Sequence, residues 1–145
     1  MSVNTIIIGL IIAIVFYEIV QISPGGLIVP GVLASYIVRL DWIIATIIIA
    51  LISMYIVKGL EKHLLIFGKR KFVLLIMISL LLSYLLSLIT SYLPFSWANI
   101  SVIGYTIAGI LASNIDKQGI KKTLPALGIV LLLTVLTVWA LSFIK

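Results

Sequence analysis

Residues 26–37 read G-L-I-V-P-G-V-L-A-S-Y-I, and residues 104–115 read G-Y-T-I-A-G-I-L-A-S-N-I. The aligned residues that the two stretches share are Gly26, Gly31, Leu33, Ala34, Ser35 and Ile37 in the first, and Gly104, Gly109, Leu111, Ala112, Ser113 and Ile115 in the second. Each stretch follows a long apolar run and a proline-containing break, and each precedes a cation and another long apolar run. Chance similarity between apolar segments is the simpler interpretation, but the repeated order of elements favours an internal duplication.

The composition identifies the solvent in which these segments fold. Hydrophobic residues make up 63% of the 145 residues, and charged residues make up only 10%. A soluble domain typically carries about 25% charged residues, because its surface must face water. The composition therefore predicts a membrane protein. The net charge of +6 does not indicate nucleic-acid binding, because most of it clusters between apolar segments.

The apolar runs predict the helices. A helix needs about 20 apolar residues to cross the hydrocarbon core. Runs of suitable length occupy residues 3–22, 42–60, 72–93 and 123–144, and shorter Gly- or Pro-interrupted pieces occupy 27–40 and 97–115. We therefore expect an all-α integral membrane protein with two repeats, each a long helix, a short interrupted segment and a long helix. The predicted organisation is a first repeat at 1–60, a basic cytoplasmic loop at 61–71 and a second repeat at 72–145.

The short interrupted segments are the expected functional region. Lipid cannot pair the backbone groups that a proline or an unwound turn leaves open, so such segments must be buried in protein or line a wet cavity. In duplicated transporters, broken segments at matching positions lie near the binding site. The candidate functional residues are Glu18, Pro24, Gly26, Pro30, Gly31, Gly104 and Gly109. An ionisable residue in a span is costly, so Glu18 is either functional or a carboxylate that reaches the headgroups.

Two basic clusters bear on orientation, because cytoplasmic loops carry an excess of Lys and Arg. The first cluster is Lys58, Lys62, Lys69, Arg70 and Lys71 against Glu61, and the second is Lys117, Lys121 and Lys122 against Asp116. Both clusters can be cytoplasmic only if the short segments cross the membrane, which makes the two halves inverted copies. If the short segments re-enter instead, the chain has four spans and parallel halves. The shortness of residues 27–40 favours re-entry, and the charge pattern favours inversion.

The sequence offers no set of residues for catalysis. It has no nucleotide-binding Gly-rich loop, no paired catalytic carboxylates and no Ser/His/Asp set. Cysteine is absent, and His63 stands alone in a basic stretch, so we expect no metal site. We therefore predict that the chain has no catalytic residue and binds no cofactor itself.

Three motifs give the chain a family resemblance. They are F-Y-E-I-V-Q-I-S-P-G-G-L-I-V-P-G at 16–31, F-G-K-R-K-F at 67–72 and G-I-L-A-S-N-I-D-K-Q-G at 109–119. Together, in this order and at this length, they resemble the CapC/PgsC family, the small membrane subunit of poly-γ-glutamate (capsule) synthesis. The family often has a second V-P-G in its second half, where this chain reads Ile107-Ala108-Gly109. That departure puts in doubt whether the two short segments share one role.

The resemblance implies a multi-pass subunit in the plasma membrane of a prokaryote. A CapB/PgsB-like cytoplasmic ligase would bind ATP and Mg²⁺ and join glutamate, and a CapA/PgsA-like partner would lie largely outside. This chain would anchor the ligase, help the anionic polymer cross and possess no nucleotide site of its own. Further copies of the chain are additional possible partners. The candidate ligase-docking residues are Lys62, Lys69, Arg70 and Lys71, although such a cluster is also an ordinary positive-inside signal.

Two other functions fit the same residues. The chain could be a stand-alone small transporter for an anionic metabolite, built from duplicated broken helices. It could also be a purely structural membrane anchor without a conduction path. A neighbouring gene for an ATP-dependent ligase would favour the synthase subunit over both alternatives.

The division of labour makes the first testable prediction. A nucleotide site needs a loop that cradles phosphates and a carboxylate that holds Mg²⁺. The acids of this chain, Glu18, Asp41, Glu61 and Asp116, are scattered among different segments. We expect the purified chain neither to bind ATP in equilibrium dialysis nor to ligate glutamate. ATP hydrolysis by the purified chain alone would contradict this assignment of roles.

Overall fold

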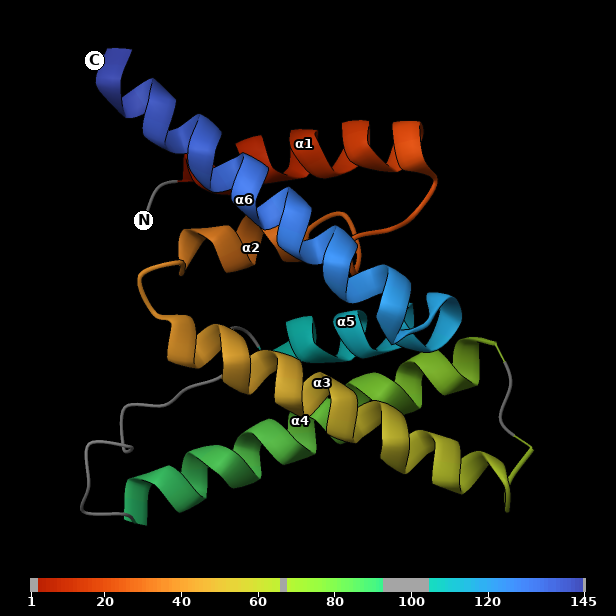
Figure 1. Ribbon diagram of the computed structural model, residues 1–145. Helices are drawn as coiled ribbons and strands as arrows, with labels where there is room; N and C mark the ends of the chain where they lie inside the picture. The colour runs from red at the N-terminus through yellow and green to blue at the C-terminus, as the bar shows by residue number, and fades with distance from the viewer. Residues whose placement is uncertain (1–2, 66–67, 93–104, 145) are drawn as a thin grey trace. The chain divides into compact units, whose positions relative to one another are not determined.

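A computed structural model of the protein describes residues 3–65, 68–92 and 105–144 (Figure 1). The regular secondary structure of these residues is helical, with no strand among them. The elements are α1 (Val3–Val20), α2 (Val29–Ser35), α3 (Leu40–Glu61), α4 (Lys69–Tyr92), α5 (Tyr105–Gln118) and α6 (Ile120–Ile144). The all-helical prediction is therefore confirmed for the described part of the chain.

The long helices have the properties of membrane spans. Among the described residues, α1, α3, α4 and α6 are long and apolar enough to cross a membrane by length and composition. Only 17% to 39% of the most apolar window of each is buried within the protein. Most of their large apolar side chains are thus left uncovered, which a bilayer accommodates and water does not.

The helices form two compact units, which we call the terminal unit and the central unit. The terminal unit comprises the described residues up to Val38 together with those from Asn114 onwards, and so contains α1, α2 and α6. The central unit runs from Arg39 to Ser113 and contains α3, α4 and most of α5. Each unit therefore combines helices from both halves of the sequence.

In the terminal unit, α2 lies directly against the backbone of α1. A Cβ added at Gly9 would clash with Gly31 Cα, and one added at Gly31 would lie 2.7 Å from the Ile6 carbonyl oxygen. The Cβ added at Gly9 would also lie 3.3 Å from Thr134 Cγ2 in α6. Figure 1 shows α2 running back alongside α1 towards its N-terminal end. The absence of side chains at Gly9 and Gly31 permits this approach.

The central unit contains a comparable contact between α5 and α4. A Cβ added at Gly109 would lie 2.6 Å from Ser79 Oγ and 2.7 Å from Ile76 Cα. Ser79 is fully buried, and its hydroxyl donates to the Ile76 carbonyl oxygen at 2.8 Å. The hydroxyl is thereby satisfied within its own helix, as expected where water is excluded. Gly109 is therefore a close-packing position, like Gly31.

Buried residues recur at the same spacing in corresponding helices of the two halves of the sequence. In the long first helices the shared positions are Thr5, Gly9 and Ala13 in α1, and Leu75, Ser79 and Ser83 in α4. In the short helices they are Val29, Pro30, Gly31, Leu33, Ala34 and Ser35 in α2, and Ile107, Ala108, Gly109, Leu111, Ala112 and Ser113 in α5. In the last helices they are Thr46, Ile49, Ala50, Ser53 and Val57 in α3, and Thr123, Ala126, Leu127, Val130 and Thr134 in α6.

The helix ends differ from the predicted segments in two places. Lys69, Arg70 and Lys71 form the first turn of α4 rather than part of a loop, because Gly68 takes a left-handed φ of 61° and turns the chain just before them. The short piece predicted at 27–40 is helical only over Val29–Ser35. Gly104 and the first part of the segment predicted at 97–115 lie outside the described residues.

The glycine contacts make the second prediction. We expect Gly9→Ala and Gly109→Ala each to destabilise the protein by about 1–3 kcal/mol, the usual cost of overpacking. Gly128→Ala is the matched control, because a Cβ there meets nothing within 4 Å. It should be neutral or stabilise the exposed helix position by up to about 1 kcal/mol. Thermal unfolding in lipid nanodiscs measures the melting temperatures of the three variants. Equal melting temperatures for Gly9→Ala and Gly128→Ala would show that Gly9 is not a close-packing position.

Candidate functional site

The break between α1 and α2 is a built turn. Helix α1 ends where the Gln21 N–H donates to the Tyr17 carbonyl oxygen at 2.8 Å, with Gln21 at a left-handed φ of 59°. Gly25 and Gly26 follow with φ of 83° and 110°, which glycine adopts without strain. The Gly26 N–H donates to Ser23 Oγ at 3.0 Å. The sequence S-P-G-G therefore specifies this turn through backbone freedom and one hydroxyl.

A distant side chain holds the break in place. The Ser23 N–H donates to Gln118 Oε1 at 2.8 Å, and Gln118 Nε2 donates to the Ser23 carbonyl oxygen at 3.1 Å. Gln118 is the last residue of α5, and Gly119 follows it with φ of 92°. One neutral amide thus satisfies both main-chain groups of Ser23. We call this pair of hydrogen bonds the Ser23–Gln118 clamp.

The clamp joins two motifs that are far apart in the sequence. Ser23 lies in S-P-G-G and Gln118 in K-Q-G, and 95 positions separate them. Unpaired backbone groups are costly near hydrocarbon, and the amide removes that cost at the break. Sequence reasoning missed Ser23, Gln118 and Gly9 as contact residues. The available signals were Gln118 within a family motif and a lone glycine in the β-branched run of α1.

The predicted site residues divide into two places along α1. Glu18, Pro24 and Gly26 lie at its C-terminal end, where Glu18 is exposed and its carbonyl oxygen accepts from Gln21 Nε2 at 3.0 Å. Pro30 and Gly31 are buried in α2. Gly31 lies opposite Ile6 and Gly9, so the structure does not bring it beside Glu18. The proline and glycine residues shape and pack the backbone here.

The remaining candidates lie elsewhere. Gly109 is in the central unit against α4, as described above, and Gly104 lies outside the described residues. Gly26 can therefore not be compared with its counterpart Gly104, and a role shared by both short segments stays a prediction.

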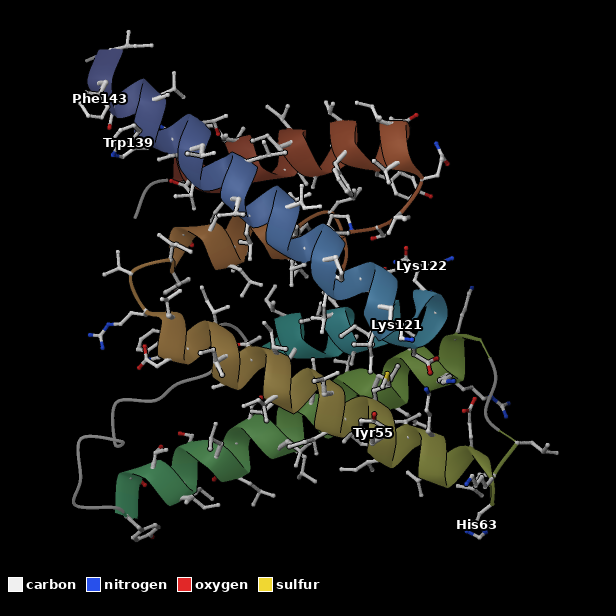
Figure 2. All side chains as sticks on the ribbon, viewed as in Figure 1. Tyr55, His63, Lys121, Lys122, Trp139 and Phe143 are labelled. Atoms are coloured by element: carbon white, nitrogen blue, oxygen red, sulfur yellow. The ribbon has the colours of Figure 1, made fainter. Side chains whose placement is uncertain are left out.

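The first basic turn joins α3 to α4. Lys71 Nζ lies 2.7 Å from Glu61 Oε1, and both side chains are partly shielded, with exposed fractions of 19% and 28%. Lys62, Lys69 and Arg70 are exposed. The ion pair ties the two helix ends together, so Lys71 has a structural partner, while the other three cations face outwards. His63 lies at the same turn and is also exposed (Figure 2).

The second basic turn joins α5 to α6, next to the clamp. Lys117, Lys121 and Lys122 are exposed, and Figure 2 shows the last two at the start of α6. The positive end of the long α6 dipole adds to the potential of these cations. The turn is therefore an electropositive surface beside the α1–α2 break.

Comparisons with known proteins agree with the three motifs. Residues 8–124 match the family described as capsule biosynthesis CapC. The chain is 31% identical over 119 residues to the PGA biosynthesis protein CapC of Bacillus subtilis (strain 168), which covers 81% of this chain and 80% of that protein. It is 27% identical over 120 residues to the capsule biosynthesis protein CapC of Bacillus anthracis, covering 82% and 80% respectively. No solved structure matches the chain.

The family match spans the break, the clamp, both short helices and both basic turns. It confirms the resemblance that the motifs at 16–31, 67–72 and 109–119 indicated. With most of its length matched to one family, the chain belongs to the capsule biosynthesis CapC family.

Proposed function

We propose that this chain is a non-catalytic, multi-pass membrane subunit of a poly-γ-glutamate synthase and export complex in a prokaryotic plasma membrane. It would anchor a cytoplasmic ATP-dependent ligase and help the anionic polymer across. The observation that carries the proposal is the family match along residues 8–124. The relatives named for capsule and PGA biosynthesis support the same process.

In the proposed topology the short segments cross the membrane as well as the long helices. The direction of α2, back along α1, supports a crossing by residues 21–38 rather than re-entry on the side where α1 ends. With six crossings, both basic turns lie on one face, which the positive-inside rule makes cytoplasmic. The Ser23–Gln118 clamp joins the α1–α2 break to the α5–α6 turn within one unit, so these two turns lie on the same face in either topology.

We further infer that the two halves are inverted copies. The repeated spacing of buried residues in α1 and α4, in α2 and α5, and in α3 and α6 supports a duplication. The last helix of each half packs against the first helix of the other half. Helix α6 packs with α1, and α3 packs with α4. Such an exchange makes each compact unit depend on both halves of the chain.

The ligase would dock on the first basic turn. Lys62, Lys69 and Arg70 are exposed there, whereas Lys71 is engaged with Glu61. Exposed cations beside the membrane suit an acidic patch on a cytoplasmic partner, and complementary charge sets register and speeds encounter. We therefore assign docking to Lys62, Lys69 and Arg70, and assign Lys71 to the α3–α4 turn itself.

The third prediction tests this docking surface. The chain, tagged and expressed with its native partners, should recover an ATP-dependent ligase that mass spectrometry identifies. Lys69→Gln with Arg70→Gln should lower ligase recovery on the order of tenfold, because two cations of a complementary interface are removed. Lys121→Gln with Lys122→Gln is the matched control, since it removes the same charge from the other basic turn.

Orientation must be verified in both variants, because the substitutions weaken the positive-inside signal. Equal recovery from the two correctly oriented variants would remove the first basic turn as the docking site. If the unaltered chain recovers no ligase at all, the subunit assignment fails and a stand-alone transporter becomes the better explanation.

A further inference from the structure

Gln118 offers its partner the chemical group that a γ-linked glutamate polymer also carries. Its side chain is a methylene chain ending in an amide, and the γ-linkage is that amide with one hydrogen replaced by the next residue. The amide oxygen accepts from the Ser23 N–H at 2.8 Å, and the amide nitrogen donates to the Ser23 carbonyl oxygen at 3.1 Å. The Ser23 backbone thus already pairs with one amide oxygen and one amide N–H, the two groups that successive γ-linkages can supply.

We propose that Gln118 occupies a polymer-binding site on the Ser23 backbone, and that γ-linked amides displace it from Ser23 as the polymer enters the protein. This inference rests on the proposed function, which supplies the polymer. The proposed ligand site is the Ser23 backbone at the α1–α2 break, which Gln118 occupies until the polymer displaces it.

The strength of the clamp suits exchange. A neutral hydrogen bond contributes only modestly to stability when a competing donor or acceptor can replace it. Both Ser23 and Gln118 are half-buried, so the pair is only partly shielded and lies where a ligand can reach it. Each polymer amide has one donor and one acceptor, so successive linkages can satisfy both Ser23 groups.

The charges around the clamp would bring the polymer to it. The charged residues on the elements that meet there are Glu18, Asp116, Lys117, Lys121 and Lys122, so the cations are in excess. The exposed lysines attract the polymer's carboxylates, which raises the local concentration of amides beside Ser23. Charge thus collects the polymer, and the uncharged receptor selects its linkage.

Displacement has a conformational consequence. Gln118 ties the break to the end of α5, while Gly25 and Gly26 supply backbone freedom inside the break. When a polymer amide replaces Gln118, the break is released from α5 and can hinge at these glycines. The clamp therefore couples arrival of the polymer to opening of the break.

The test places a nitroxide spin label at Ile22→Cys in the full-length chain, which has no cysteine of its own. Purified protein in nanodiscs is titrated with γ-linked polyglutamate, and with polyacrylate as a polyanion without amides. We expect the γ-linked polymer to raise the mobile fraction of the label on the order of tenfold, the effect of losing two modest hydrogen bonds. We expect polyacrylate to leave it unchanged. An equal response to polyacrylate, or none to either polymer, would overturn the displacement.

Gln118→Glu, measured without polymer, tests the clamp separately. Its carboxylate can accept from the Ser23 N–H but cannot donate to the Ser23 carbonyl, so the label should be mobile at neutral pH. Below the ordinary Glu pKa of about 4.3, the protonated acid has one donor and one acceptor again and should immobilise the label. Gln118→Ala should stay mobile at every pH. A Gln118→Glu label that is immobile at neutral pH would show that the reciprocal pair does not hold the break.

A second readout distinguishes failure of the Gln118 displacement from failure of the proposed function. Retention of fluorescent γ-linked polymer on the same nanodiscs is measured alongside label mobility. If the polymer binds and mobility does not change, the inference about Gln118 is wrong and the proposed function stands. If the unaltered chain recovers no ligase, the proposed function itself is wrong, whatever the label mobility shows.

Discussion

The fold depends on satisfying the backbone of two short helices in a solvent that offers no hydrogen bonds. Lipid cannot pair the groups freed by a break, so the interrupted segments must pack against protein. Glycine makes this possible at Gly9 and Gly31, where two backbones meet without side chains, and at Gly109, which lies against Ile76 and Ser79. The long apolar helices then keep most of their surface for the bilayer.

Much of this architecture could be predicted from the sequence, because long apolar runs and Gly/Pro breaks are local signals. The described helices occur where such runs were predicted, and Gly31 and Gly109 are close-packing positions. The partners of these glycines could not be predicted, since Ile6, Gly9 and Ile76 are ordinary residues in apolar helices. Nor could the Ser23–Gln118 pair, because periodicity contains no information on which distant amide meets a given turn.

The candidate site was predicted less completely than the fold. The family motifs contain the break and the K-Q-G turn. Glu18, which was a candidate because an ionisable residue within a span is costly, is exposed at the end of α1. We propose the neutral Ser23–Gln118 clamp, flanked by lysines, as the site, and a role for Glu18 stays a prediction. This division suits a polyanion, because cations can gather it while an uncharged receptor distinguishes its linkage. It also leaves the two basic turns with different proposed tasks, ligase docking and polymer capture.

The central claim is that the short segments cross the membrane, which makes the halves inverted and places both basic turns inside. Because the chain has no cysteine, single cysteines at positions 69 and 122 can be tested without background. A membrane-impermeant thiol reagent is applied to intact cells and to inside-out vesicles. With six crossings, both positions should be labelled only in inside-out vesicles. Labelling of position 122 in intact cells, with position 69 protected, would contradict inversion and support four spans with re-entrant segments.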